Sequence, residues 1–393
     1  MPALRRPGFR VLLGASGLNA GSMAGELVVV GWLVLELSFM VGLALALTFL
    51  PMVLLGLPAG ALADLFDRRR LLRGLDAALA LTAALAGVLA LFDLLDVWRL
   101  FALVFVSGSF RACYHPIRLA YAHDVAGPGA VISALSLINL STRCGQLVGA
   151  AAAGSLIQRA GPEFAFFGLA ALHAGALGML FALRIRTATR TTPREPVLDN
   201  LRAFARELRT NRTLLSLVGL TAAVEVLGFS YMTALPALAR DVLGVGAEGL
   251  GLLTALQAVG GILATLLLTA QGEFARRGAV YLGIILLFGL GLIALGASRL
   301  FGFAAVAVAF VAGMASLSDI LTQAMMQYSV PDHLRGRAMG SWVFAVGSSP
   351  LGHLQMGALA AAIGPSAALL LHGAGLIALA GLVAVAVPRL RRL

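Results

Sequence analysis

The chain has no lysine and few charges of either sign. Only 12% of its 393 residues are charged and 60% are hydrophobic, which excludes an ordinary water-soluble domain. All 29 basic residues are arginine, and the formal net charge is +11. A basic chain can indicate nucleic-acid binding, but these arginines stand in short segments between apolar runs and form no basic face of a soluble domain. We therefore expect no nucleic-acid partner.

Sequence motifs for catalysis are missing as well. The chain contains no Gly-x-x-x-x-Gly-Lys loop for a nucleotide phosphate, no Ser/His/Asp spacing and no paired set of metal ligands. The two cysteines, Cys113 and Cys144, both fall within apolar runs, where we interpret them as small packing residues. These absences argue against an ATP-driven pump, an enzyme, a metal site and a bound cofactor.

Long apolar runs fill most of the chain. A membrane-spanning helix needs about 20 apolar residues, and the sequence offers twelve such runs. The predicted spans are residues 11–35, 40–63, 71–93, 98–121, 130–158, 163–184, 212–238, 247–270, 279–298, 301–328, 337–361 and 365–387.

The arginines alternate with these spans. If the N-terminus is cytoplasmic, 22 arginines fall in cytoplasmic segments, four fall in outside loops, and three lie within spans. Positive residues are retained on the cytoplasmic side of a membrane, so this split predicts an even number of spans with both termini in the cytoplasm. We expect a multi-pass protein of the cytoplasmic membrane, surrounded by lipid and monomeric.

One connection is much longer than the others. It predicts a six-helix N-terminal bundle over residues 1–184, a cytoplasmic linker over 185–211 and a six-helix C-terminal bundle over 212–393. Within the linker, Glu195–Arg212 has an apolar face and predicts a helix on the inner membrane surface; the alternative is a solvated linker with some helix content. Weak similarity between the halves, at an offset near 206 residues, indicates an internal repeat with pseudo-two-fold symmetry.

The segment between the second and third spans resembles a known signature. The pattern Gly-x-Leu-Ala-Asp-Arg-x-Gly-Arg-Arg marks this loop in the major facilitator superfamily. The matching residues are Gly60, Leu62, Ala63, Asp64, Arg68 and Arg69. Asp67 stands where the superfamily usually has glycine; the branch of macrolide and siderophore exporters often has aspartate there, as this chain does. Leu65 stands where arginine is usual.

This resemblance implies a fold and a conformational latch. The fold is an all-α integral membrane protein with twelve helices in two six-helix bundles. The latch role of the signature is carried over to Asp64 and Arg68, with Asp124 at the end of the fourth span as the expected partner of Arg68. Gly60 allows a neighbouring helix to approach closely. Residues 235–251 and 330–337 resemble further segments of the same exporter branch.

Three acids lie inside predicted spans, where each charge costs about 2.5–3.5 kcal/mol on insertion scales. They are Glu26, Glu225 and Asp319. The resemblance places their spans, the first, seventh and tenth, around a central cavity. We predict that at least one of them couples transport to protons. The alternative is that each pairs with an arginine and holds helices together. Asp76, near the cytoplasmic end of the third span, is interpreted as a partner of the basic loop.

A polar face is predicted on the fourth span. Arg111, His115 and Arg118 are spaced to share one side of that helix, and we expect them to bind an anionic or polar substrate group or to tune a cavity acid. Alternatively, Arg111 satisfies a buried carboxylate and Arg118 meets Asp124 or a lipid phosphate. Further candidates for contact with the substrate are Asn19, Tyr114, Tyr231, Gln257 and Gln323.

These observations predict a secondary transporter that works by alternating access. We expect the proton gradient to supply its energy. The resemblance to the exporter branch implies the direction of transport, so we expect efflux of amphiphilic small molecules, either drugs or siderophore-like compounds. A lipid or lysophospholipid mover and a uniporter of a polar metabolite are the alternatives. A non-transporting membrane sensor or scaffold is a more remote one.

Overall fold

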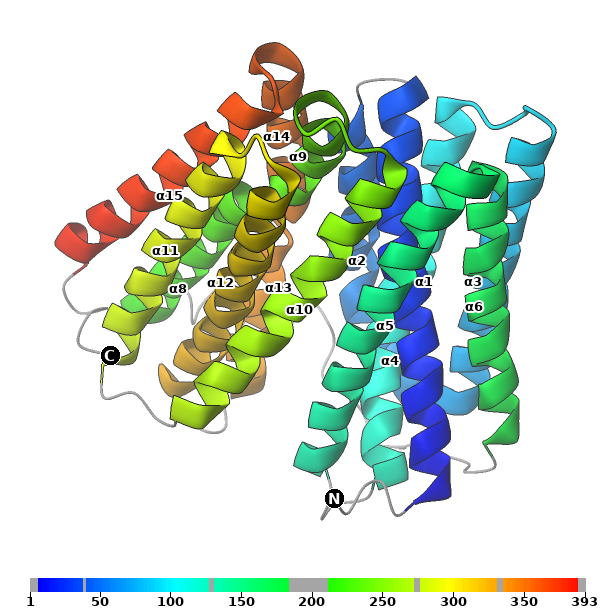
Figure 1. The fold of residues 1–393 in the computed structure, drawn as a ribbon. Helices are drawn as coiled ribbons and strands as arrows, with labels where there is room; N and C mark the ends of the chain where they lie inside the picture. Colours follow the sequence, from blue (N-terminus) through cyan, green and yellow to red (C-terminus); the bar gives the residue numbers. More distant parts are fainter. Residues whose placement is uncertain are drawn as a thin grey trace. The chain divides into compact units, whose positions relative to one another are not determined.

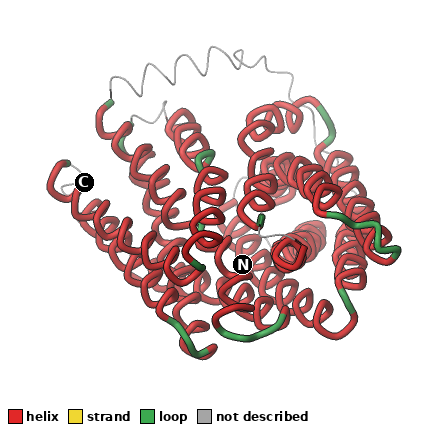
Figure 2. The backbone as a smooth tube through the Cα atoms, turned by 90° about the horizontal axis from the view of Figure 1, so that it is seen from above, coloured by secondary structure: helices red, strands yellow, loops and turns green. Residues whose placement is uncertain are grey.

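The computed structural model describes residues 6–37, 40–126, 131–183, 211–271, 276–330 and 335–387. Every regular element in these ranges is a helix (Figure 2). The all-α fold predicted from the sequence is therefore confirmed.

The first six helices agree closely with the predicted spans (Figure 1). Their bounds differ from the predicted ones by a few residues, in either direction. They are α1 (Pro7–Leu37), α2 (Val41–Leu65), α3 (Arg68–Leu91), α4 (Val97–Ala126), α5 (Val131–Ala160) and α6 (Pro162–Ala182).

The second set contains two interrupted spans, which the sequence analysis treated as continuous. The seventh span consists of α8 (Arg212–Val224), the π-helical turn η2 (Glu225–Phe229), α9 (Tyr231–Ala237) and a second π-helical turn, η3 (Leu238–Val242). The eleventh consists of α13 (Arg335–Val346) and α14 (Ser349–Ile363). The uninterrupted helices are α10 (Ala247–Gln271), α11 (Arg277–Ala297), α12 (Phe301–Tyr328) and α15 (Pro365–Ala386).

Proline explains where the eleventh span restarts. Pro350 stands in the first turn of α14, where its missing N–H leaves no helical hydrogen bond unmade. The turn before it is closed by Ser348, whose hydroxyl donates to the carbonyls of Ala345 and Ala222 at 2.8 and 3.1 Å. After this break α14 packs against η2 and α9 of the seventh span, and its His353 contacts Thr233 there.

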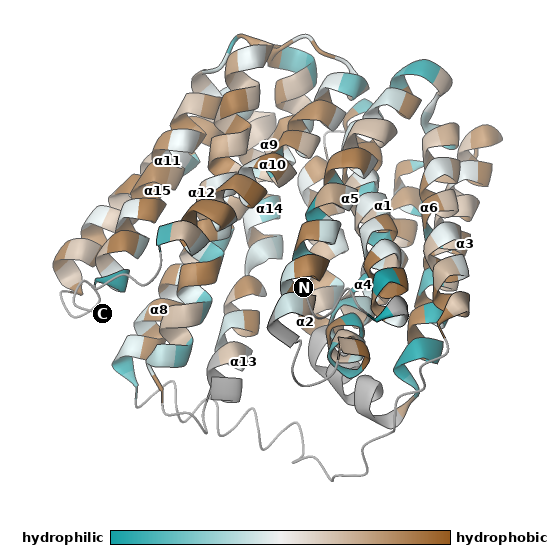
Figure 3. Cartoon of the chain, turned by 60° about the horizontal axis from the view of Figure 1, so that its bottom comes forward, coloured by the Kyte–Doolittle hydropathy of each residue, from teal (hydrophilic) through white to brown (hydrophobic). Residues whose placement is uncertain are grey.

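The surface of the helices suits a lipid environment. Nine of the spans within the described ranges, counting residues 212–242 as one, are long and apolar enough to cross a membrane. Large apolar side chains project outward from them, with Leu81, Val306 and Val385 71%, 69% and 78% exposed. Figure 3 shows the apolar colouring along most of the helices.

The chain divides into two compact units. One contains Met1–Thr192 and Val245–Ala258, and the other contains Pro193–Gly244 and Val259–Leu393. The first part of α10 thus groups with the N-terminal helices. The predicted linker, residues 185–211, lies almost wholly outside the described residues. The predicted surface helix Glu195–Arg212 lies largely outside them too. Both stay predictions.

The two halves pair their spans in the same order. The first span packs on the fifth, as α1 on α5 and η2 on α14; the second packs on the fourth, as α2 on α4 and α10 on α12; the third packs on the sixth, as α3 on α6 and α11 on α15. This shared order supports the internal repeat predicted from the sequence.

Glycine makes the tightest of these crossings possible. A Cβ atom added to Gly145 or Gly149 of α5 would collide with the backbone of Gly17 or Gly21 of α1. Without side chains at these positions the two backbones touch, as in other small-residue crossings of membrane helices. The position of α1, and of the acid it carries, is fixed by this contact.

Candidate functional site

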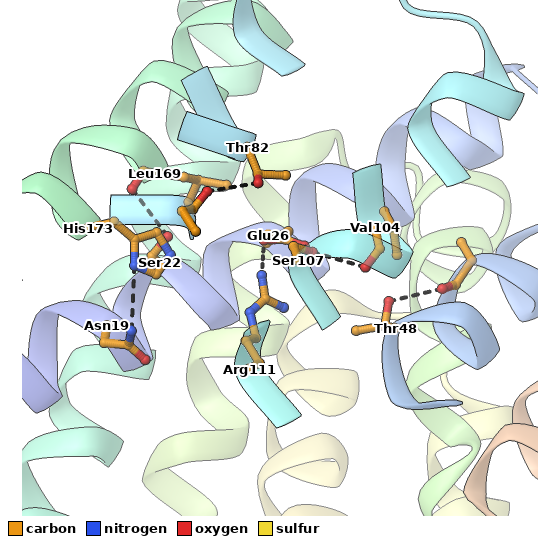
Figure 4. A network of polar contacts seen from close by, with 12 residues as sticks. Asn19, Ser22, Glu26, Thr48, Thr82, Val104, Ser107, Arg111, Leu169 and His173 are labelled. Carbon is orange, nitrogen blue, oxygen red and sulfur yellow. Dashed lines mark hydrogen bonds and ion pairs between the residues drawn. The ribbon is translucent and has the colours of Figure 1, made fainter. Parts of the chain in front are cut away.

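Glu26 and Arg111 form a buried ion pair in the N-terminal unit (Figure 4). Glu26 lies on α1 and is 8% exposed, while Arg111 reaches it from α4. The Ser107 hydroxyl donates to the other carboxylate oxygen at 2.6 Å. The charge of Glu26 is thus balanced within its own unit, as the helix-pairing alternative in the sequence analysis expects.

A small cavity adjoins this ion pair. Its lining includes Glu26 of α1, Thr82 of α3, Ser107 of α4 and Phe166 of α6, and its volume is about 20 Å³. A cavity of this size holds about one water molecule. It is far too small for an amphiphilic substrate, so it adds a place for water beside the carboxylate rather than a substrate site.

A second polar network in the same unit is more completely buried than the Glu26–Arg111 pair. Asp76 of α3 is 0% exposed and its Oδ1 accepts a hydrogen bond from Asn19 Nδ2 at 2.7 Å. His173 of α6, 1% exposed, has Nδ1 3.2 Å from the same oxygen. Asp76 is therefore a buried partner of α1 and α6, and its assignment to the basic loop was wrong.

Depth within the membrane could have revealed this pair. Asp76 lies eight residues, about 12 Å, from the start of α3, and His173 lies nine residues, about 14 Å, from the end of α6. These two helix ends meet, because Arg73 donates to the carbonyl of Leu180 at 2.8 and 3.0 Å. The similar distance of Asp76 and His173 from these two helix ends is the sequence signal that could have predicted their contact.

The predicted polar face of α4 does not form one site. Arg111 binds Glu26, whereas the charge of Arg118, which is 7% exposed, interacts with Asp76. Tyr114 is buried beside the same aspartate. His115 is the exposed member of the three. Each arginine of this face therefore serves a different buried acid.

The predicted latch pair joins the start of α3 to the end of α4. Arg68 Nη1 lies 2.5 Å from Asp124 Oδ2 of α4, so the expected contact is present. Its latch role stays a prediction. Gly60 and Asp64 belong to the last turns of α2, where the described structure gives the helix but not the side chains.

The C-terminal unit holds an acid with different surroundings. Glu225 begins η2 and is 6% exposed. Within the described residues it forms no ion pair; its neighbours are Asp319 of α12, a second acid, and Ser349 of α14, which lies within hydrogen-bonding reach. Asp319 is half-buried and accepts a hydrogen bond from Trp342 Nε1 at 2.9 Å.

Two buried histidines flank this acid, and no pattern in the sequence selects either of them. His353 of α14 has Nδ1 2.8 Å from Thr233 Oγ1 and Nε2 3.3 Å from Ser349 Oγ. His372 of α15 has Nδ1 3.1 Å from Ser230 Oγ. Each histidine is 1% exposed.

The remaining substrate candidates do not gather at one described site. Asn19 donates its side-chain hydrogen bond to Asp76. Tyr231 is buried in the C-terminal unit, edge-on to Phe288 at 6.5 Å between ring centroids. Gln257 is buried on α10 and Gln323 is half-buried on α12. Contact of any of them with a substrate stays a prediction.

The profile of one protein family spans the whole chain, since the transmembrane secretion effector profile matches residues 1–393. The chain belongs to the transmembrane secretion effector family. Members of this family are major facilitator transporters, so the protein is a multi-pass membrane transporter and not an enzyme. The resemblance noted in the sequence analysis is confirmed.

Two curated relatives are similar over most of their length. The staphyloferrin A transporter of Staphylococcus aureus is 24% identical over 315 residues, which cover 78% of this chain and 77% of the relative. The uncharacterized MFS-type transporter YfiS of Bacillus subtilis is 28% identical over 350 residues, which cover 84% of this chain and 80% of the relative.

Solved structures confirm the twelve-helix fold of this transmembrane secretion effector. A POT family transporter in complex with 5-aminolevulinic acid superimposes with a TM-score of 0.79 at 11% identity, covering 98% of this chain and 97% of that one. A mutant form of the nucleoside transporter NupG gives 0.76 at 14% identity, covering 95% and 98%. At these identities the likeness concerns the fold alone.

Proposed function

We propose that this protein exports amphiphilic small molecules of the siderophore type across the cytoplasmic membrane, in exchange for protons that bind Glu225. The family match supports secondary transport, and the staphyloferrin A transporter of S. aureus supports the substrate class. The observation that carries the coupling proposal is the contrast between Glu26, which has its arginine, and Glu225, which pairs with no described cation.

The physical argument concerns the cost of a buried charge. A desolvated carboxylate without a partner is strongly unfavourable in a protein interior, and a neighbouring acid such as Asp319 adds repulsion. Glu225 is neutralised either by a proton or by a cationic group that enters its surroundings. If proton and substrate cannot both be accommodated, release of one favours binding of the other, which is the minimum that antiport requires.

Transport in proteoliposomes with an imposed pH gradient tests this proposal. The probes are ethidium, staphyloferrin A and a fluorescent lysophospholipid. We expect gradient-driven movement of one of the first two, accompanied by proton flux. Movement of the lysophospholipid alone would support the lipid-mover alternative, and movement without proton flux, or no movement of any probe, would contradict the proposal.

The variant Glu225→Gln then isolates the acid. Gradient-driven efflux should fall about 100-fold, in the range that loss of a proton-transfer group produces, while exchange of labelled for unlabelled substrate without a gradient should persist. Glu163→Gln is the matched control, since Glu163 lies in the first turn of α6 and far in sequence from any buried acid. Full coupling in Glu225→Gln would show that the proton binds elsewhere.

A further inference from the structure

The side chains around Glu225 continue into a hydrogen-bonded chain. Ser349 lies within reach of Glu225, its Oγ is 3.3 Å from His353 Nε2, and His353 Nδ1 is 2.8 Å from Thr233 Oγ1. All four residues belong to the C-terminal unit. All are buried: Glu225 is 6% exposed, Ser349 8%, His353 1% and Thr233 2%.

We propose that Thr233, His353 and Ser349 form a proton path that serves Glu225. This inference rests on the proposed function, because it assumes that Glu225 binds the coupling proton. What it adds is a route and three residues to which no transport role was assigned above.

Each member of the chain has the chemistry that such a path needs. A hydroxyl both donates and accepts a hydrogen bond, and a neutral imidazole donates from one nitrogen while it accepts at the other. When the Thr233 hydroxyl takes up a proton from water at the outer end of the path, it releases its own proton to Nδ1 of His353, while Nε2 releases one to Ser349 Oγ. Ser349 in turn gives its own hydroxyl proton to the Glu225 carboxylate, so one proton enters the chain for each that reaches the acid. Rotation of the hydroxyls and of the ring restores the starting arrangement.

The interrupted helices bring these groups together. The π-helical turn η2 begins at Glu225, and π-turns inside helices often occur at functional sites. The start of α14 supplies Ser349, and its backbone lies against η2, since a Cβ on Gly352 would be 2.7 Å from Val226 Cα. Figure 1 shows α14 and α9 close to each other, and the two helices are in contact.

The path has a direction. Thr233 lies eight residues, about 12 Å, beyond Glu225 along the seventh span, and His353 lies four residues, about 6 Å, beyond Ser349 along the eleventh. With both termini in the cytoplasm, as the arginine distribution predicts, both steps lead toward the outside. An exporter driven by a proton gradient takes up protons from that side.

Other ionisable groups surround Glu225 and are accounted for. Asp319 of α12 is near enough for its charge to act on Glu225. The helices packed against η2 contribute His353 on α14, His372 on α15, Tyr281 on α11 and Tyr231 on α9. The remaining titratable residues on these helices are Arg212 at the start of α8 and Arg277 at the start of α11, where Arg277 stacks on the Tyr328 ring. Of the two buried histidines, only His353 bonds to Ser349 in the described structure; His372 bonds to Ser230 and to the Leu227 carbonyl.

Time-resolved infrared spectroscopy tests the path without any substrate. Purified transporter in proteoliposomes is exposed to an acid jump on the outer side, and the carbonyl band of the newly protonated carboxylic acid is followed. Loss of this band in Glu225→Gln identifies the acid. A band that persists in Glu225→Gln contradicts the proposed function itself, and the path with it.

The path is tested by the rate at which that band appears. In His353→Gln, which keeps hydrogen-bonding groups but cannot relay a proton, we expect the rate to fall about ten-fold or more. Thr233→Val should slow it too, while Thr233→Ser should not. His372→Gln is the matched control, because it alters an equally buried histidine of the same unit. An unchanged rate in His353→Gln, or an equal loss in His372→Gln, overturns the proposal.

Discussion

Glu26 and Glu225 lie in the first span of each half, yet their surroundings are opposite. Glu26 meets Arg111 and the Ser107 hydroxyl, while Glu225 meets a serine and a second acid and pairs with no described cation. The sequence alone treats both as equivalent intramembrane acids. The difference teaches that the value of such an acid for proton coupling depends on whether the fold has already supplied its counter-charge.

The largest expected effect comes from making Glu26 resemble Glu225. Arg111→Ala leaves the Glu26 carboxylate buried without its cation, which should destabilise the protein by about 3–5 kcal/mol. Thermal unfolding in detergent measures the change. The double variant Arg111→Ala/Glu26→Gln should recover most of the loss, because it removes both charges.

The comparison breaks if this recovery is absent. Equal stability of Arg111→Ala and the parent protein would mean that Glu26 does not depend on its arginine. A double variant no more stable than Arg111→Ala would place the loss in packing of the arginine side chain rather than in the charge.

A smaller effect is expected at the crossing that positions α1. Gly149→Ala places a methyl group against the backbone of Gly21, and overpacking of this kind typically costs about 1–3 kcal/mol. Gly178→Ala on α6 is the control, since a Cβ there meets nothing within 4 Å. Thermal unfolding should separate the two variants; equal midpoints would show that the crossing is looser than described.

The positions of the spans could be predicted because they depend on the local composition of the chain and not on contacts between distant residues. A bilayer selects apolar runs of fixed length and sorts arginine to one side, and both signals can be read directly along the chain. The start of α15 at Pro365 agrees with the predicted span at 365, and α12 ends at Tyr328 as expected.

The partners of the buried polar groups could not be predicted in the same way. A helix that faces lipid on one side and protein on the other is apolar on both, so its rotation is not readable from hydropathy. The sequence therefore placed Arg111 and Arg118 on one face of α4 but left open which acid each would meet. The contact between Asp76 and His173 was not predicted for the same reason, although the two residues lie at similar depth along their helices.

The interruptions of the seventh and eleventh spans were missed because they are local. Glu225 to Phe229 carries no proline and one glycine, so nothing in its composition distinguishes a π-helical turn from an α-helical one. Gly347, Ser348 and Ser349 precede Pro350 and favour a turn followed by a helix start, but the sequence analysis treated residues 337–361 as one continuous span.

An equilibrium infrared titration between about pH 5 and pH 9 tests the contrast between the two glutamates most directly. The transporter is held in lipid, and the buried carboxylic-acid band is compared in the parent protein, Glu225→Gln and Glu26→Gln. We expect a titrating band that disappears in Glu225→Gln and persists in Glu26→Gln. A band that disappears in Glu26→Gln and persists in Glu225→Gln would contradict this assignment of the coupling proton.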